Sequence, residues 1–308
     1  MKKMNGMYVI GIDHGYGNMK TANCCFQTGI MKSDMEPTFA GDLIVWNDKY
    51  YSVGIGHKEF LADKFLDEDY YVLTLAAIAR ELRRERITEA TVFIAAGLPL
   101  TWVSEQKAEF KKYLLRQNVV MFRFRNTEYR VRIAGVEIYP QGFAAVAEKL
   151  REFRGVNLLC DIGNGTMNLL RIVNGKADAQ HMFTEKYGTH QCALLIREQM
   201  MKKYHATIDD AIITEILKKG TADIDRRYLD TILRTAKEYT AGIFKRLREH
   251  EYDPNLMKLY VVGGGGCLIR NFADYDRNRV IVNEDICATA KGYEYMACVT
   301  LNRNGGMV

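Results

Sequence analysis

One short pattern occurs twice in this chain and restricts the folds that it can adopt. The stretches 7-MYVIGIDHGYGNMKTAN-23 and 156-VNLLCDIGNGTMNLLRI-172 each run from apolar residues to an aspartate, then to Gly-x-Gly, and then to a second strand-like segment. Asp13 and Asp161 occupy the same place in the two copies. Each copy predicts two strands joined by a glycine-rich turn. The chain is therefore expected to contain two related units that begin with the same strand–turn–strand motif.

Length and composition agree with two units. The chain has 308 residues, of which 48% are hydrophobic and 26% are charged, and such values are ordinary for a globular protein that buries its own core. The net charge of +5 is mild. Its short basic runs, 83-RRER-86 and 245-KRLR-248, lie in helical patterns and indicate solvated helix faces. No direct binding of nucleic acid is expected.

The seven cysteines do not form a metal or disulfide pattern. Their number is odd, and no Cys-x-x-Cys pair or His/Cys cluster at zinc spacing occurs. We therefore expect a reducing, cytoplasmic environment. The start of the chain meets Asp13 before a signal-like apolar core develops, and the longest uncharged run is too short to span a bilayer. Neither a secretion signal nor contact with a membrane is expected.

Periodicity predicts an alternation of strands and helices, which is typical of an α/β fold. The strands are predicted at 8–12, 18–26, 43–48, 50–56, 91–99, 119–124, 128–139, 156–162, 167–175, 176–183 and 258–266. The helices are predicted at 71–86, 104–117, 143–153, 190–204, 207–218, 226–250, 267–272 and 287–301. The pattern of strands followed by helices restarts after Gly155.

The chemistry of Asp-x-Gly-x-Gly between two strands favours a phosphate site. Glycines allow successive backbone N–H groups to converge on an anion. A carboxylate is repelled by bare phosphate, so Asp13 and Asp161 make chemical sense as a pair that holds a hydrated Mg²⁺. Two such hairpins, facing each other across a cleft, would grip one di- or triphosphate. The alternative for either copy alone is an ordinary glycine-rich turn.

A third glycine-rich element supports the phosphate interpretation. The stretch 261-VVGGGG-266 is a strand that runs into glycines at the start of a short helix, where backbone can lie flat against a nucleoside. The alternative is a flexible loop, but a flexible loop does not readily explain four glycines directly after a strand of the buried type.

At these residues the sequence resembles the actin/Hsp70/sugar-kinase ATPase superfamily, and within it the bacterial actin-like proteins of the ParM type. The stretch 13-DHGYGNMK-20 is similar to the first phosphate loop, 161-DIGNGTMN-168 to the second, and 262-VGGGG-266 to the adenosine loop. Two further stretches, 96-AGLPL-100 and 138-IYPQGFAAV-146, are similar to segments of the first domain in such proteins.

The resemblance implies a two-domain actin-like ATPase fold, made of duplicated ribonuclease H-like domains around a nucleotide cleft. It implies that domain I comprises residues 1–154 plus 287–308, and that domain II comprises residues 155–286. It also implies that Gln141 orients the attacking water by hydrogen bonding, whereas Asp13 and Asp161 bind Mg²⁺ through water. The residues that the resemblance places beside ATP or GTP are Gly15, Tyr16, Gly17, Asn18, Lys20, Gly163, Asn164, Gly165, Thr166, Gly188, Gly263, Gly264, Gly265 and Gly266.

Several positions depart from the family pattern. Tyr16 stands where many relatives have serine, so that only its backbone N–H remains for a phosphate contact. Asn164, Met167 and Asn168 replace residues that in relatives are often glycine, threonine and aspartate. His14 lies inside the first loop, but strand alternation turns its side chain away from that of Asp13, which favours a structural role.

The resemblance implies an ATPase that polymerises when nucleotide is bound and segregates DNA through an adaptor protein. The expected partners are further copies of the chain and that DNA-binding adaptor. The main alternative is a small-molecule kinase of the sugar-kinase type, but such enzymes need a carboxylate base where this chain has Gln141. An Hsp70-like regulator is expected least, because no peptide-binding region follows Val308.

Overall fold

The computed structural model describes residues 1–38, 41–55, 67–100 and 102–305. Its contacts divide the chain into two compact units, one formed by Met1–Glu148 with Cys287–Val308 and the other by Lys149–Ile286.

The described part of the first unit forms one sheet of ten strands, in the order β4-β3-β2-β8-β10-β9-β6-β7-β5 with β1 paired to β2. The strands are β1 (Lys2–Met4), β2 (Met7–His14), β3 (Asn18–Lys20), β4 (Cys25–Gln27), β5 (Ile30–Ser33), β6 (Asp42–Trp46), β7 (Lys49–Val53), β8 (Glu89–Leu98), β9 (Val119–Phe124) and β10 (Thr127–Pro140). The helices are α1 (Asp69–Arg84), α2 (Val103–Leu114) and α7 (Ala288–Gly305).

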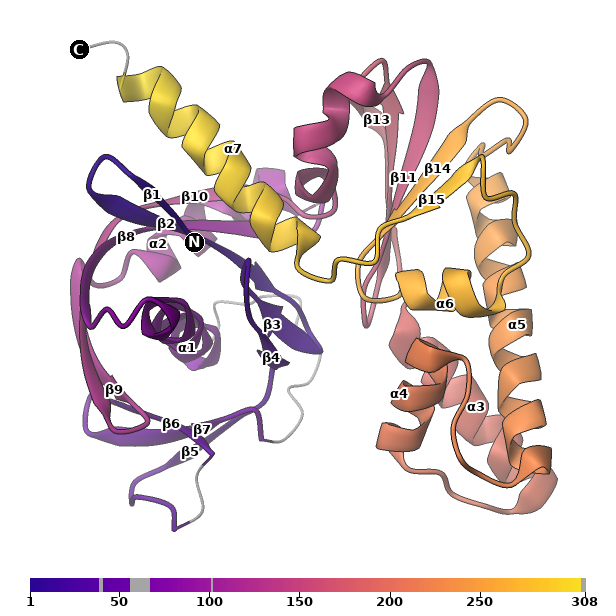
Figure 1. Cartoon of the computed structure of the whole chain (residues 1–308), viewed down its shortest axis with the longest axis horizontal. Helices are drawn as coiled ribbons and strands as arrows, with labels where there is room; N and C mark the ends of the chain where they lie inside the picture. Colours follow the sequence, from indigo (N-terminus) through magenta and orange to yellow (C-terminus); the bar gives the residue numbers. More distant parts are fainter. Residues whose placement is uncertain (39–40, 56–66, 101, 306–308) are drawn as a thin grey trace. The chain divides into compact units, whose positions relative to one another are not determined.

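Strand alternation decides which helix covers which face of this sheet. Ile10 and Ile12 of β2 belong to the core that contains α1, whereas Val9, directly before Ile10, packs with Tyr293 and Ala297 of α7. Helix α1 lies inside the curve of the sheet and is buried around almost its whole circumference (Figure 1), as expected for a helix that is apolar on all sides.

The second unit has a sheet of five strands in the order β13-β12-β11-β14-β15. The strands are β11 (Val156–Ile162), β12 (Met167–Val173), β13 (Lys176–Glu185), β14 (Lys258–Val262) and β15 (Val280–Val282). The helices are α3 (Thr189–Tyr204), α4 (Asp210–Lys219), α5 (Arg226–Glu249) and α6 (Gly266–Phe272). These helices share one core with Leu158, Cys160 and Ile162 of β11 and with Leu259 and Val261 of β14.

The repeated strand–turn–strand motif forms the same local structure in both units. Strand β2 pairs antiparallel with β3 and parallel with β8, and β11 pairs antiparallel with β12 and parallel with β14. Asp13 lies opposite Lys20, and Asp161 lies opposite Asn168. In each copy the aspartate is therefore the second-to-last residue of its strand and faces a residue seven positions later.

The structure corrects several local predictions. The segment 18–26 is not one strand, because Thr21 N donates to Cys24 O (2.8 Å) in a turn between β3 and β4. The segment predicted as a helix at 143–153 is a 3₁₀ helix, η1 (Phe143–Glu152), and an apolar periodicity does not distinguish the two kinds of helix. Strands β1, β5 and β15 were not predicted, since three or four residues carry too little pattern. Residue 56, at the end of one predicted strand, lies outside the described residues.

Candidate functional site

The first loop is fixed by contacts within its own unit. Lys20 Nζ lies 3.2 Å from Asp13 Oδ2, which follows from their cross-strand pairing. Gln141, directly after β10, donates from Nε2 to Asp13 Oδ1 at 2.9 Å. Asp13 is a buried residue, with only 5% of its surface exposed. Three residues that the sequence marked as site residues thus meet at one carboxylate.

The orientation of the Gln141 amide follows from this contact. A carboxylate can only accept hydrogen bonds, so Gln141 must present its NH₂ group to Asp13, and this leaves Oε1 as its remaining acceptor. The backbone N–H of Gln141 donates to Leu98 O at 2.8 Å, which ties the residue to the end of β8. Gln141 Oε1 can therefore accept a hydrogen bond from a water molecule while Nε2 stays bound to Asp13.

The turn after Asp13 is held by a residue that was not predicted. Thr28 is buried, its hydroxyl donates to Gly15 O at 2.7 Å, and its backbone N–H donates to Gly17 O at 3.1 Å. A side chain on Gly15 would come within 2.5 Å of Asn18 O, so the tight turn requires glycine there. No local signal marks Thr28, because it acts on residues 11 to 13 positions earlier.

His14 has the structural place that alternation predicts. The residue is fully buried, its Nε2 lies 2.8 Å from Thr74 Oγ1 in α1, and its ring packs edge-on against Phe110.

The second loop contacts the third glycine-rich element within the second unit. Asp161 pairs with Val262 across parallel strands β11 and β14. Gly263 has a φ of +86°, and a Cβ there would lie 2.3 Å from Asp161 Oδ1. Gly265 donates from its N–H to Ile162 O at 2.8 Å. Glycine at 263 is therefore required both by the backbone conformation and by the carboxylate beside it.

The remaining predicted residues of this unit lie around the same turn. Gly163 donates from its N–H to Thr166 O at 2.8 Å, which closes the hairpin turn. A Cβ on Gly188 would lie 2.3 Å from Asn164 O. A Cβ on Gly264 would meet no heavy atom within 4 Å, whereas one on Gly266 would approach Val282 Cγ1 at 3.2 Å. Residues 163–166, 188 and 263–266 are thus neighbours in space.

The two aspartates suit a hydrated cation better than a cage of protein ligands. Among the residues described, no three His, Cys, Asp or Glu side chains are grouped closely enough to hold a metal ion. Mg²⁺ keeps several of its waters and commonly uses one or two carboxylates together with phosphate oxygens. Single buried carboxylates beside glycine turns fit this type of coordination.

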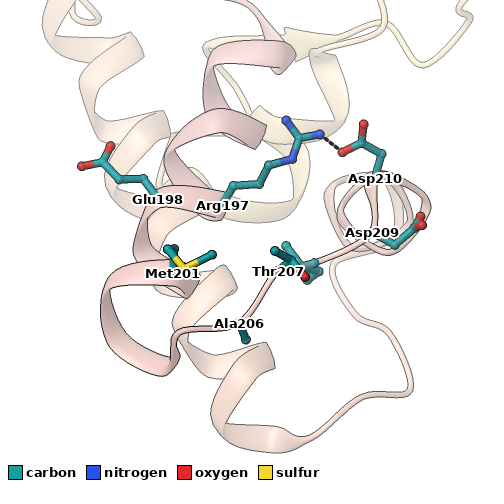
Figure 2. A pocket seen from close by; sticks show the side chains of 8 residues that line it. Arg197, Glu198, Met201, Ala206, Thr207, Asp209 and Asp210 are labelled. Atoms are coloured by element: carbon teal, nitrogen blue, oxygen red, sulfur yellow. Dashed lines mark ion pairs between the residues drawn. The ribbon is translucent and has the colours of Figure 1, made fainter. Parts of the chain in front are cut away.

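A surface hollow of about 620 Å³ lies elsewhere in the second unit, between the second half of α3 and the start of α4. Figure 2 shows Arg197 reaching from α3 to its ion-pair partner Asp210. Asp209 caps α4 by accepting a hydrogen bond from Ala211 N at 2.7 Å. These charged groups already have protein partners, and none of the residues lining the hollow was predicted as a site residue.

Comparison with known proteins identifies the class of the fold. Residues 11–143 match the family model described as "Actin like proteins N terminal domain". No curated protein sequence is similar enough to the chain to count as a match. Residues 11–143 are thus similar to the N-terminal domain of actin-like proteins, and the predicted resemblance to ParM-type actin homologues is confirmed.

Solved structures extend the similarity to nearly the whole chain. The archaeal actin homologue Ta0583 has a TM-score of 0.76 at 17% identity and covers 95% of this chain and 100% of its own. The Alp12 filament structure has a TM-score of 0.68 at 15% identity, with 96% and 100% covered. Bacillus thuringiensis ParM with ATP has a TM-score of 0.72 at 13% identity, with 96% of this chain and 100% of that chain covered. The predicted two-domain actin-like α/β fold is confirmed.

Proposed function

We propose that this chain is an actin-like ATPase that forms filaments when it binds ATP or GTP with Mg²⁺. The observation that carries the proposal is the doubled hairpin, in which Asp13 and Asp161 occupy equivalent positions beside glycine turns. The printed descriptions of similar structures, a ParM with ATP and an Alp12 filament, support nucleotide binding and self-association.

In this proposal the two glycine turns bind the phosphates of one nucleotide, and the glycines at 263–266 lie along its nucleoside. Asp13 and Asp161 hold Mg²⁺ through water, and the ion would neutralise charge on the phosphates. Lys20 adds a positive charge beside Asp13. Gln141 orients the attacking water through Oε1, because its Nε2 is bound to Asp13. An amide is a weak base, so its contribution is positioning rather than proton removal.

We further propose that the filament moves plasmid or other mobile DNA in the cytoplasm through a DNA-binding adaptor, without binding DNA or a membrane itself. Among the described residues, no helix has the length and hydropathy needed to cross a bilayer. The proposed domain boundaries are those that the resemblance implies. Domain I comprises residues 1–154 and 287–308, and domain II comprises residues 155–286.

Light scattering on the purified chain tests the proposal. We expect scattering to rise with Mg²⁺-ATP or Mg²⁺-GTP above a critical protein concentration, and phosphate release to follow the amount of polymer. A small-molecule kinase would instead turn over only when its acceptor is added, and its specific activity would not depend on protein concentration. Scattering that stays flat with either nucleotide at all protein concentrations would contradict a filament-forming ATPase.

A further inference from the structure

The N-terminus of α3 is bonded to the second glycine turn through two consecutive backbone groups. Thr189 N donates to Gly163 O at 3.1 Å, and His190 N donates to Asn164 O at 2.8 Å. The first N–H groups of a helix have no partner within the helix and carry its positive dipole end. In many proteins such groups bind an anion directly. In this chain they bind the carbonyls of the turn instead.

Side chains fix the same junction. The Thr189 hydroxyl donates to Asn164 Oδ1 at 3.1 Å. Gly188 precedes the helix, and its N–H donates to Gln191 Oε1 at 2.8 Å while its carbonyl accepts from the Tyr239 hydroxyl at 2.7 Å. The close approach of Gly188 to Asn164 O leaves no room for a Cβ. The start of α3 is therefore held by both the turn and α5.

These bonds act on the peptide groups that would meet phosphate. The Gly163 carbonyl belongs to the same peptide as Asn164 N–H, and the Asn164 carbonyl belongs to the same peptide as Gly165 N–H. A carbonyl that accepts a hydrogen bond polarises its peptide, and chains of hydrogen bonds strengthen one another. The helix thus orients two successive N–H donors and makes both of them stronger.

We propose that Thr189 and Asn164 are positioning residues for polyphosphate binding, through which α3 holds the N–H groups of Asn164 and Gly165 toward the phosphates. This inference rests on the proposed nucleotide binding. It also gives a role to the side chain of Asn164, which accepts the hydrogen bond from the Thr189 hydroxyl. A glycine at this position would lack that acceptor. The specific substrate feature that the pair recognises is the phosphate chain and not the nucleoside.

The test compares Thr189→Val with Thr189→Ser. Valine has nearly the same shape but lacks the hydroxyl, whereas serine keeps it. Calorimetry would measure the affinities of ATP, ADP and adenosine in the presence of Mg²⁺, with thermal unfolding of the free protein as a folding check. We expect Thr189→Val to weaken ATP and ADP binding by about three- to tenfold, the usual effect of one lost hydrogen bond. Adenosine binding should stay the same, and Thr189→Ser should restore ATP binding.

The outcomes separate this inference from the proposed function. Equal losses for ATP and adenosine, or no loss in Thr189→Val, would overturn the positioning role while wild-type nucleotide binding remained. If the wild-type chain bound ATP without polymerising, the proposal of filament formation would be wrong. The affinities of the Thr189 variants would still decide the positioning role. If the wild-type chain bound neither ATP nor ADP, both proposals would be wrong.

Discussion

The side-chain amide of Gln141 donates a 2.9 Å hydrogen bond to Asp13, 128 residues earlier in the chain. The bond joins the residue after β10 to the end of β2, two strands that both pair with β8. Because it sets which end of the amide faces Asp13, it also sets which atom of Gln141 is left to orient a water. The proposed catalytic group is therefore held before any nucleotide binds.

Removing this amide should slow hydrolysis and leave assembly intact. Gln141→Ala is expected to lower the rate of phosphate release at least about tenfold, because loss of one oriented polar group commonly costs this much or more. The onset of light scattering with ATP should not change. Gln180→Ala, on the exposed part of β13, is the matched control and should leave both signals unchanged. Normal hydrolysis by Gln141→Ala would show that the assignment is wrong.

Asp161→Asn should remove the benefit that Mg²⁺ gives to nucleotide binding. The amide keeps the shape of the side chain but lacks the charge that favours a hydrated divalent cation. We expect wild-type affinity for ATP to fall when EDTA is added, and the variant to show low affinity in both conditions. The exposed Asp223→Asn is the control. A variant that still gains affinity with Mg²⁺ would argue against Asp161 as a ligand.

Two neighbouring glycines should differ sharply in their tolerance of a methyl group. Gly263→Ala forces a Cβ to within 2.3 Å of Asp161 Oδ1 at a φ of +86°, whereas Gly264→Ala meets no heavy atom within 4 Å. We expect Gly263→Ala to lower the free energy of unfolding by about 1–3 kcal/mol, and Gly264→Ala to change it by less than about 1 kcal/mol. Denaturant unfolding without nucleotide measures both values. Equal stability of the two variants would contradict this local geometry.

Two buried glutamates should respond to pH in opposite directions. Burial tends to raise the pKa of Glu81, but hydrogen bonds from Thr21 and Asn23 outweigh it, so the pKa is lowered from 4.5. Burial dominates for Glu294, and its pKa is raised from 4.5 although it accepts a hydrogen bond from Gly11 N. The contribution of the Glu81 carboxylate to the free energy of unfolding is thus present above about pH 4.5 and is lost as pH falls. Glu294 acts in the opposite direction, because the free energy of unfolding falls as pH rises through its raised pKa.

The matching experiment is denaturant unfolding of Glu81→Gln and Glu294→Gln between pH 3 and pH 7. At pH 7 we expect Glu81→Gln to lower the free energy of unfolding by about 1–3 kcal/mol, and this deficit to shrink toward pH 3. Glu294→Gln should be no less stable than wild type at pH 7, because the cost of burying the Glu294 charge outweighs its attraction to the Met1 ammonium, 3.3 Å away. A deficit for Glu81→Gln that stays constant with pH would show that the ionised carboxylate is not what stabilises the fold.

Elements that depend on short-range stereochemistry could be predicted from residue types and their spacing. Residue types at fixed spacing predicted the two hairpins and the aspartate near the end of each first strand, because glycine permits tight turns. They also predicted that successive side chains of β2 point to opposite faces of the sheet. The helices at 71–86, 190–204 and 226–250 were predicted within a few residues of α1, α3 and α5. These predictions needed no knowledge of distant residues.

Contacts between groups far apart in the chain depend on tertiary packing. The bonds of Gln141 to Asp13, Thr28 to Gly15 and Tyr239 to Gly188 join residues 128, 13 and 51 positions apart, and no local pattern encodes such a pairing. The same applies to β15, whose three residues form a strand only because β14 lies beside them. Hydrogen bonds between distant residues depend on how whole strands and helices pack, so their geometry is fixed only once the core has formed.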